Sequence, residues 1–176
     1  MQEKKVWNDC MEGLLYYTPD EVVFDKKKTC CFSGHRKFNI KNISLRTIGH
    51  HLLDLVDNRG YDTFLIGGAI GFDTFAFTIL EKLRLSRNIK IVLCAPCRNQ
   101  EKPWSKKQKQ EYRYVCENVD KIVLVKEYYD EKCMHKRNDY MVENSTEIIV
   151  YKRHNFGGTY YTLDKAERER INIFKV

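Results

Sequence analysis

Proline, glycine and long apolar runs are all scarce in this sequence. The 176 residues include 3 Pro and 9 Gly, which excludes collagen-like and low-complexity chains. No segment approaches the roughly 20 apolar residues that a membrane-spanning helix needs. Residues 1–9 contain no apolar region of the kind that signal peptides carry. We therefore expect a cytoplasmic protein with no membrane partner.

A disulfide framework and metal-ligand spacings are also missing. The chain has seven cysteines, an odd number without framework spacing, which indicates reduced thiols. Cys94 and Cys97 form a C-x-x-C pair, but Cys94 falls inside a predicted strand and no second pair accompanies it. We therefore predict no metal and no cofactor. Four histidines lack metal-ligand spacing and are expected to be dispersed over the surface: His50, His51, His135 and His154.

The composition is that of one folded domain. Hydrophobic residues make up 43% of the chain and aromatic residues 12%, which excludes disorder as the main state. A chain of this length fits a single domain with a proper core. The net charge of +7 favours a phosphate-bearing partner, either a nucleotide or a nucleic acid.

Short apolar runs alternate with segments of helical periodicity from Lys28 onward. Because parallel strands need crossover connections, this rhythm predicts an α/β fold of Rossmann-like type, a mostly parallel sheet with helices on both faces. We expect one domain over 28–176, with 1–27 as an N-terminal arm packed on it. The predicted strands are 29–33, 62–66, 89–95, 121–126, 147–151 and 171–174, and the predicted helices are 43–59, 73–85, 104–118, 130–145 and 159–170.

In such folds ligands bind beyond the C-terminal ends of the strands, so the residues there are the candidate site. Ser33, Gly34, His35 and Arg36 follow the first strand. Glycine lets the backbone approach a ligand, and arginine offers two parallel hydrogen bonds to a phosphate. The alternative is an ordinary turn with a solvated basic patch.

A glycine-rich segment follows the second strand and opens a helix. Gly67, Gly68, Ala69 and Gly71 can point bare backbone N–H groups at an anion. The segment is neither a Walker A loop nor the G-x-G-x-x-G fingerprint. Asp73 is open to two interpretations, a helix N-cap or an acceptor for a ribose hydroxyl.

Basic and aromatic residues follow the third strand. Arg98, Gln100 and Trp104 begin a cationic segment, in which an aromatic ring could stack a base while the charges hold phosphate. The alternative is a solvated helix face with one apolar anchor. Arg137 and Asn138 precede the fifth strand and either reach the crevice or belong to an amphipathic core helix.

A second glycine-rich helix start follows the fifth strand. Gly157, Gly158 and Thr159 suit a second phosphate or a close backbone approach. Two such starts in one small α/β domain are more specific than either alone.

The ordered set of motifs resembles a known family. Residues 31–36, 67–74, 133–142 and 157–159 resemble the SLOG superfamily (SMF/DprA–LOG), most closely its YoqJ/YpsA-like branch, from about Lys28 to Val176. The resemblance implies a Rossmann-like fold and a nucleotide-derived ligand near the glycine loops. The superfamily includes cytokinin-activating phosphoribohydrolases, a DNA-processing protein and sensors of nucleotide signals in phage defence, which also suggests a prophage setting.

Three functions remain open. The first is binding of a nucleotide-derived ligand by a receptor or sequestering protein; Thr162 stands where the phosphoribohydrolase branch has a catalytic Glu, which favours binding over turnover. The second is hydrolysis of a nucleotide or N-glycosidic bond, with Asp73, His35 or Glu143 as the acid or base. The third is nucleic-acid binding through residues 98–113. Because relatives in the superfamily are often dimers, we expect a homodimer.

Overall fold

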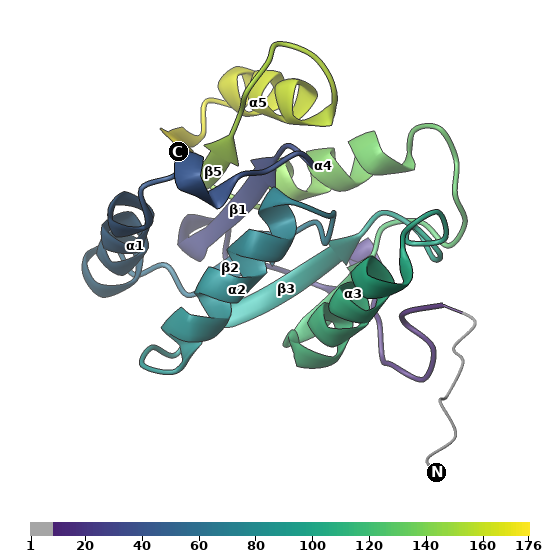
Figure 1. Ribbon diagram of the computed structural model, residues 1–176. Coiled ribbons are helices and arrows are strands. Elements are labelled where there is room, and N and C mark those ends of the chain that lie inside the picture. Colours follow the sequence, from purple (N-terminus) through teal and green to yellow (C-terminus); the bar gives the residue numbers. More distant parts are fainter. Residues whose placement is uncertain (1–8) are drawn as a thin grey trace.

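The computed structural model describes residues 9–176; the part of the predicted N-terminal arm in residues 1–8 lies outside them. Six parallel strands form one sheet in the order β4-β3-β2-β1-β5-β6 (Figure 1). This confirms the predicted single-domain Rossmann-like α/β fold. The strands are β1 (Thr29–Gly34), β2 (Thr63–Ile66), β3 (Lys90–Ala95), β4 (Lys121–Leu124), β5 (Glu147–Tyr151) and β6 (Asn172–Lys175).

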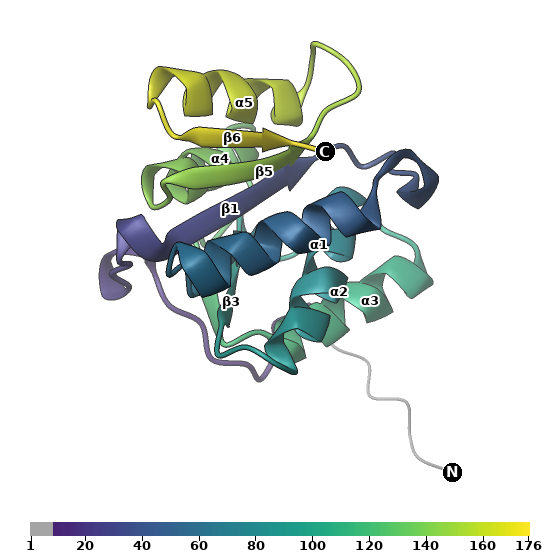
Figure 2. The ribbon, with the colours of Figure 1, turned by 90° about the vertical axis from the view of Figure 1, so that its left-hand side faces the viewer.

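Helices cover both faces of the sheet. On one face lie α1 (Leu45–Leu53), which continues as a π-helical turn η4 (Asp54–Asn58), α2 (Phe72–Arg84) and α3 (Lys106–Asn118). On the other face lie α4 (Cys133–Glu143) and α5 (Gly158–Arg168), as Figure 2 shows. Three short 3-10 turns are η1 (Pro19–Glu21), η2 (Lys26–Lys28) and η3 (Ile40–Asn42). Within the described part of the chain, no helix has the length and apolarity to cross a membrane.

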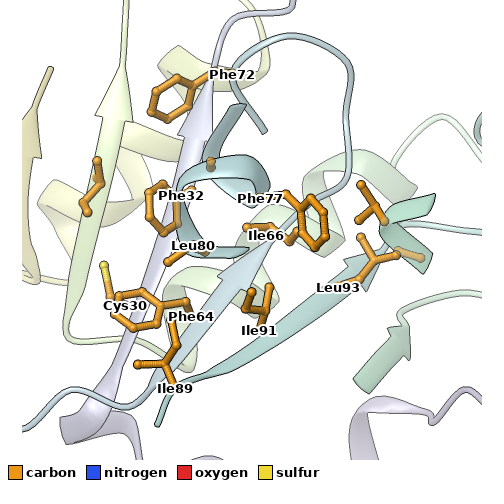
Figure 3. Close-up of a cluster of buried hydrophobic side chains, with 14 of the residues drawn as sticks. Cys30, Phe32, Phe64, Ile66, Phe72, Phe77, Leu80, Ile89, Ile91 and Leu93 are labelled. Carbon is orange, nitrogen blue, oxygen red and sulfur yellow. The ribbon is translucent and has the colours of Figure 1, made fainter. Parts of the chain in front are cut away.

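The alternation of side chains along each strand divides the core into two layers. Cys30 and Phe32 of β1 pack with the helices α1, α2 and α3, whereas Cys31 between them packs with α4 and α5. Figure 3 shows the first layer, in which Phe77 and Leu80 of α2 lie over the strands. Because both faces are covered, the central strands are apolar throughout.

The residue before each helix determines how the N-terminus of that helix is capped. Ser44 and Ser105 accept hydrogen bonds from the backbone N–H groups of Thr47 and Gln108 at 3.1 and 3.3 Å, which caps α1 and α3. By contrast, the N-cap residues of α2 and α5 are Gly71 and Gly157, and no described side chain caps either helix. Two glycine-rich loops thus replace the capping residues.

The segment before β1 runs along the β4 edge of the sheet. Tyr17 donates its N–H to Ile122 O at 2.9 Å and accepts from Leu124 N at 2.8 Å, so it pairs with β4. Cys10 and Met11 are buried against the core.

The order of the strands places the candidate site. The chain builds β1 to β4 in one direction and then crosses back to lay β5 on the other side of β1. This reversal lies between β1 and β5, and in open α/β sheets it leaves a crevice at the C-terminal ends of the strands.

Candidate functional site

A cavity of about 440 Å³ opens at the C-terminal ends of β1 and β5, where the strand order reverses. We call it the switch-point cavity. Its walls come from the β1–α1 and β5–α5 loops, from the start of α2 and from the inner faces of α4 and α5. The lining residues are Phe32, Ser33, Gly34, His35, Arg36, Lys37, Ala69, Asp73, Met134, His135, Arg137, Asn138, Met141, His154, Gly158 and Thr159.

Histidines and exposed cations dominate the β1 side of this cavity. His35 is 8% exposed, and its ring lies 3.8 Å from the ring of His154, centroid to centroid. His35 Nε2 is buried and has no hydrogen-bond partner among residues 9–176. Burial, with the nearby His154 and Arg153, lowers the pKa of His35, so its ring is neutral at pH 7. Arg36 is exposed at the rim.

The 67–71 loop is filled by the protein itself. The carboxylate of Asp73 accepts from Ala69 N at 3.2 Å and also interacts with the backbone amide of Gly67. A side chain at Gly67 would collide with Arg137 Nη1 and Asp73 Oδ2, since an ideal Cβ would lie 2.2 and 2.7 Å from them. At Gly71, an ideal Cβ would lie 2.2 Å from the carbonyl oxygen of Arg36.

Asp73 therefore occupies the position that an anion would take in an empty loop of this kind. It is not the N-cap of α2, which is Gly71. Burial raises the pKa of the Asp73 carboxyl, whereas Arg137 and the amides of Ala69 and Gly67 act in the opposite direction. Asp73 is the only carboxylate among the described residues that line the switch-point cavity.

Arg137 and Asn138 connect α4 to this arrangement. The buried guanidinium of Arg137 donates from Nη1 to the carbonyls of Gly67 and, at 3.5 Å, Cys94, so it joins the ends of β2 and β3. Its Nε donates to Asn138 Oδ1 at 2.7 Å. The other end of the Asn138 amide faces Gly158, where an ideal Cβ would lie 3.8 Å from Nδ2. Both residues face the cavity from α4 rather than filling the core.

The start of α5 is open. Gly157 has a positive φ of 85°, and an ideal Cβ there would meet no described atom within 4 Å. Gly158 and Thr159 line the cavity, with Thr159 buried. Free amide N–H groups and the positive end of the helix dipole make such a terminus suited to an anion. Of the two glycine-rich starts, this is the one with room for a ligand.

A second cavity of about 610 Å³ adjoins the first. We call it the tyrosine-lined cavity. It shares Arg36 and Met134 with the switch-point cavity, so the two are contiguous. Its lining residues are Arg36, Arg98, Asn99, Gln100, Lys102, Pro103, Trp104, Tyr128, Tyr129 and Met134.

The structure divides the sequence-predicted site residues into three groups. The switch-point cavity holds Ser33, Gly34, His35, Arg36, Ala69, Asp73, Arg137, Asn138, Gly158 and Thr159, and the tyrosine-lined cavity adds Arg98, Gln100 and Trp104. Gly67, Gly68, Gly71 and Gly157 shape the loops without lining a cavity.

Two residues with a possible catalytic position lie elsewhere. Glu143 is at the C-terminal end of α4, where its carboxylate accepts from Lys165 Nζ at 2.7 Å. Thr162 is fully buried, and its hydroxyl donates to Gly158 O at 2.7 Å. Neither lines the switch-point cavity.

Sequence reasoning missed several lining residues. His135 and His154 are exposed, as predicted, but they are not dispersed, because both line the switch-point cavity. No motif marks Tyr128 and Tyr129, which lie in the loop between β4 and α4. Only one signal in the sequence could have found these four residues: ligands of such folds bind beyond the C-terminal ends of the strands. The two tyrosines follow β4, His154 follows β5, and His135 lies in the first turn of α4.

The cysteines form no described metal site. All seven are free and buried. Cys97 contacts Cys133, with 3.9 Å between the Sγ atoms, and burial raises the pKa of Cys97 to about 12. No group of three or more His, Cys, Asp or Glu residues in the described range 9–176 could hold a metal ion.

A parallel sheet with a cationic, histidine-lined cavity at its switch point defines a Rossmann-like α/β protein. Comparison with known proteins gives the family. The chain belongs to the YpsA family, described as YspA SLOG family, whose model matches residues 27–173. This confirms the resemblance to the SLOG superfamily.

Curated relatives point to the same branch. The SPbeta prophage-derived protein YoqJ of Bacillus subtilis is 28% identical over 128 residues, which cover 65% of this chain and 75% of YoqJ. The UPF0398 protein lmo1889 of Listeria monocytogenes is 24% identical over 133 residues, or 73% of each chain.

Two solved structures share the fold. DNA processing protein A from Helicobacter pylori superposes with a TM-score of 0.55 at 14% identity, and DprA from Streptococcus pneumoniae with 0.59 at 16% identity. The matches cover 86% and 85% of this chain, which spans 66% and 50% of those proteins.

Proposed function

We propose that this protein binds a nucleotide-derived ligand in the switch-point cavity, with a phosphate at the N-terminus of α5. The observation that carries the proposal is the open helix start at Gly157 and Gly158, which faces a cavity with a buried, unpartnered nitrogen of His35. The exposed guanidinium of Arg36 at the same cavity supplies a fixed positive charge for the phosphate.

Membership of a SLOG family supports a role connected with nucleotides or nucleic acids. A solved structure with the same fold is titled for the single-stranded DNA binding mode of the H. pylori protein. The size of the switch-point cavity, about 440 Å³, favours a small ligand, because such volumes are typical of small-molecule sites.

The chemistry of the lining favours binding over hydrolysis. Hydrolysis of an N-glycosidic or phosphate bond needs a positioned general acid or base. Asp73, the only described carboxylate in the cavity, already accepts a hydrogen bond from Ala69 and lies beside Arg137. Thr162 offers no acid at all, since its hydroxyl is committed to Gly158 O.

Isothermal titration with the four nucleoside 5′-monophosphates and ADP-ribose tests the proposal. We expect at least one probe to bind, and Arg36→Ala to weaken it by about 1.5–3 kcal/mol, the usual contribution of a charged hydrogen bond. The matched control is Arg46→Ala on the exposed surface of α1, which should keep full affinity.

Three results would count against the proposal. Equal loss of affinity in the two arginine variants would remove Arg36 from the site. Turnover of the bound probe would favour hydrolysis instead. Affinity only for an oligonucleotide, falling steeply with added salt, would favour nucleic-acid binding. Native mass spectrometry of the same preparation would identify co-purified nucleotide and test the expected homodimer by the number of chains.

A further inference from the structure

We propose that the natural ligand is a dinucleotide, two nucleosides joined through phosphate, whose second base lies in the tyrosine-lined cavity. This inference rests on the proposed function, which places the first nucleotide in the switch-point cavity. Four observations carry it: the adjacency of the two cavities, their sizes, the aromatic rings of the second cavity and the distribution of its charges.

The two cavities meet at Arg36 and Met134, which line both. The backbone of Arg36 is held in place there, because its carbonyl oxygen packs directly against Gly71. With volumes of about 440 and 610 Å³, each cavity by itself falls within the roughly 300–1,000 Å³ of typical small-molecule sites. A single mononucleotide would leave one of them empty.

The second cavity is built to contact flat rings. Tyr128 and Tyr129 are 79% and 69% exposed, an uncommon degree of exposure for two adjacent aromatic side chains. Trp104 is half-buried and anchored, since its ring packs in a T-shaped arrangement against buried Tyr112 with 5.4 Å between centroids. Aromatic rings of this kind stack nucleobases with little preference for sequence.

The distribution of the cationic side chains favours a position for the linking phosphate at Arg36, in the wall that the two cavities share. Arg98 is committed to the protein, since it pairs with Asp9 at 3.2 Å and Glu127 at 3.4 Å. The exposed cations that face this cavity without a hydrogen bond or ion pair within residues 9–176 are Arg36 and Lys102. Because Arg36 also faces the first cavity, its guanidinium lies where a linking phosphate would pass between the two bases.

Trp104 offers a direct report on the second cavity. The chain has two tryptophans, so Trp7→Phe leaves Trp104 as the single tryptophan, which excitation at about 295 nm reports apart from the 11 tyrosines. We would titrate this variant with AMP and with two dinucleotides, the phosphodiester-linked pApA and the pyrophosphate-linked diadenosine diphosphate. We expect a dinucleotide to quench the fluorescence of Trp104 and to bind at least tenfold more tightly than AMP. AMP should leave the fluorescence of Trp104 unchanged.

A double substitution, Tyr128→Ala with Tyr129→Ala, tests the stacking. Loss of a stacked base should weaken dinucleotide binding on the order of 5- to 100-fold and leave AMP binding intact. The substituted rings are largely in solvent, so the fold should be unaffected. Tyr114→Ala is the matched control, because Tyr114 is half exposed on α3 and lines neither of these cavities.

The outcomes separate this inference from the proposed function. If AMP and both dinucleotides bind equally, and Arg36→Ala weakens all of them, the first site stands and the dinucleotide inference fails. If none of the probes binds, both fail. If only one dinucleotide shows the gain, its linkage distinguishes a nucleic-acid fragment from a pyrophosphate-linked metabolite. If the double tyrosine variant binds that dinucleotide with wild-type affinity, its second base does not lie in the tyrosine-lined cavity.

Discussion

Two helices of this protein begin at glycine-rich loops, and the loops are used in opposite ways. The 67–71 loop before α2 is closed: Asp73 accepts from one of its amides, and Arg137 fills the space beside Gly67. The loop before α5 is open, with no described atom within 4 Å of the place where a side chain on Gly157 would begin. Similar sequence patterns thus serve internal packing in one place and leave an unfilled helix terminus in the other.

The difference lies in what the neighbouring elements supply. At α2, α4 contributes a long cationic side chain and α2 contributes its own carboxylate, so the loop needs no external anion. At α5, the neighbour is the short amide of Asn138, which leaves room at Gly158. A glycine-rich helix start therefore marks a ligand site only when the protein does not provide the anion itself.

The largest effect should come from Gly71→Ala. The new methyl group would meet the carbonyl oxygen of Arg36, and the backbone there has a φ of 89°. Overpacking and left-handed strain together should lower the free energy of unfolding by about 3 kcal/mol. A thermal melt should show this as a midpoint roughly 6–12 °C lower.

Gly60→Ala separates the two causes of that loss. Gly60 has a similar φ of 74° but open space around it, so the variant should lose only about 1 kcal/mol. Equal midpoints for the two variants would mean that the contact between the new methyl group at Gly71 and the Arg36 carbonyl costs nothing.

A smaller effect, on binding rather than folding, is expected from Gly158→Ala. Its methyl group would make an ordinary contact with Asn138, so stability should change by less than about 1 kcal/mol. The same methyl would stand where we place the phosphate, and titration should show at least tenfold weaker binding, about 1.4 kcal/mol. Gly49→Ala, at an open position within α1, is the control that should keep wild-type affinity. Wild-type binding by Gly158→Ala would move the phosphate away from α5.

The smallest effect concerns pH. Burial lowers the pKa of His35 in the folded protein below its ordinary value of 6.5. Below pH 6.5 the unfolded chain therefore binds a proton that the folded protein does not, and stability falls as the pH drops below 6.5. Urea unfolding should show a lower free energy of unfolding at pH 5.5 than at pH 7.5, and the His35 part of this difference should be absent in His35→Gln. An unchanged pH dependence in that variant would show that His35 is not the group that titrates.

Most of the fold could be predicted from the sequence, because each strand is a short apolar run and each helix has apolar residues along one face. The strand Glu147–Tyr151 was predicted to the residue. The predicted helix over 43–59 begins two residues later, at Leu45, and changes to a π turn after Leu53. Such details depend on packing against the sheet, which periodicity does not encode.

The candidate site was less accessible to sequence reasoning. Arg36 and Gly158 could be named because they directly follow strands, and the fold rule brings those positions together. The filling of Gly67 by Arg137 could not, because these residues are 70 positions apart and the contact depends on how α4 lies on the sheet. The pairing of His35 with His154 likewise exists only once β1 and β5 are neighbours.

The pairing of Tyr17 with β4 has a consequence for how molecules of this protein can associate. An uncovered sheet edge is a template for aggregation, and the backbone of Tyr17 occupies hydrogen-bonding positions on that edge. At the opposite edge, β6 carries the exposed residues Asn172 and Lys175 and pairs only with β5 within the described chain. Polymerisation by strand addition is therefore obstructed at one edge, and β6 is the edge at which engineered charge or proline would suppress it.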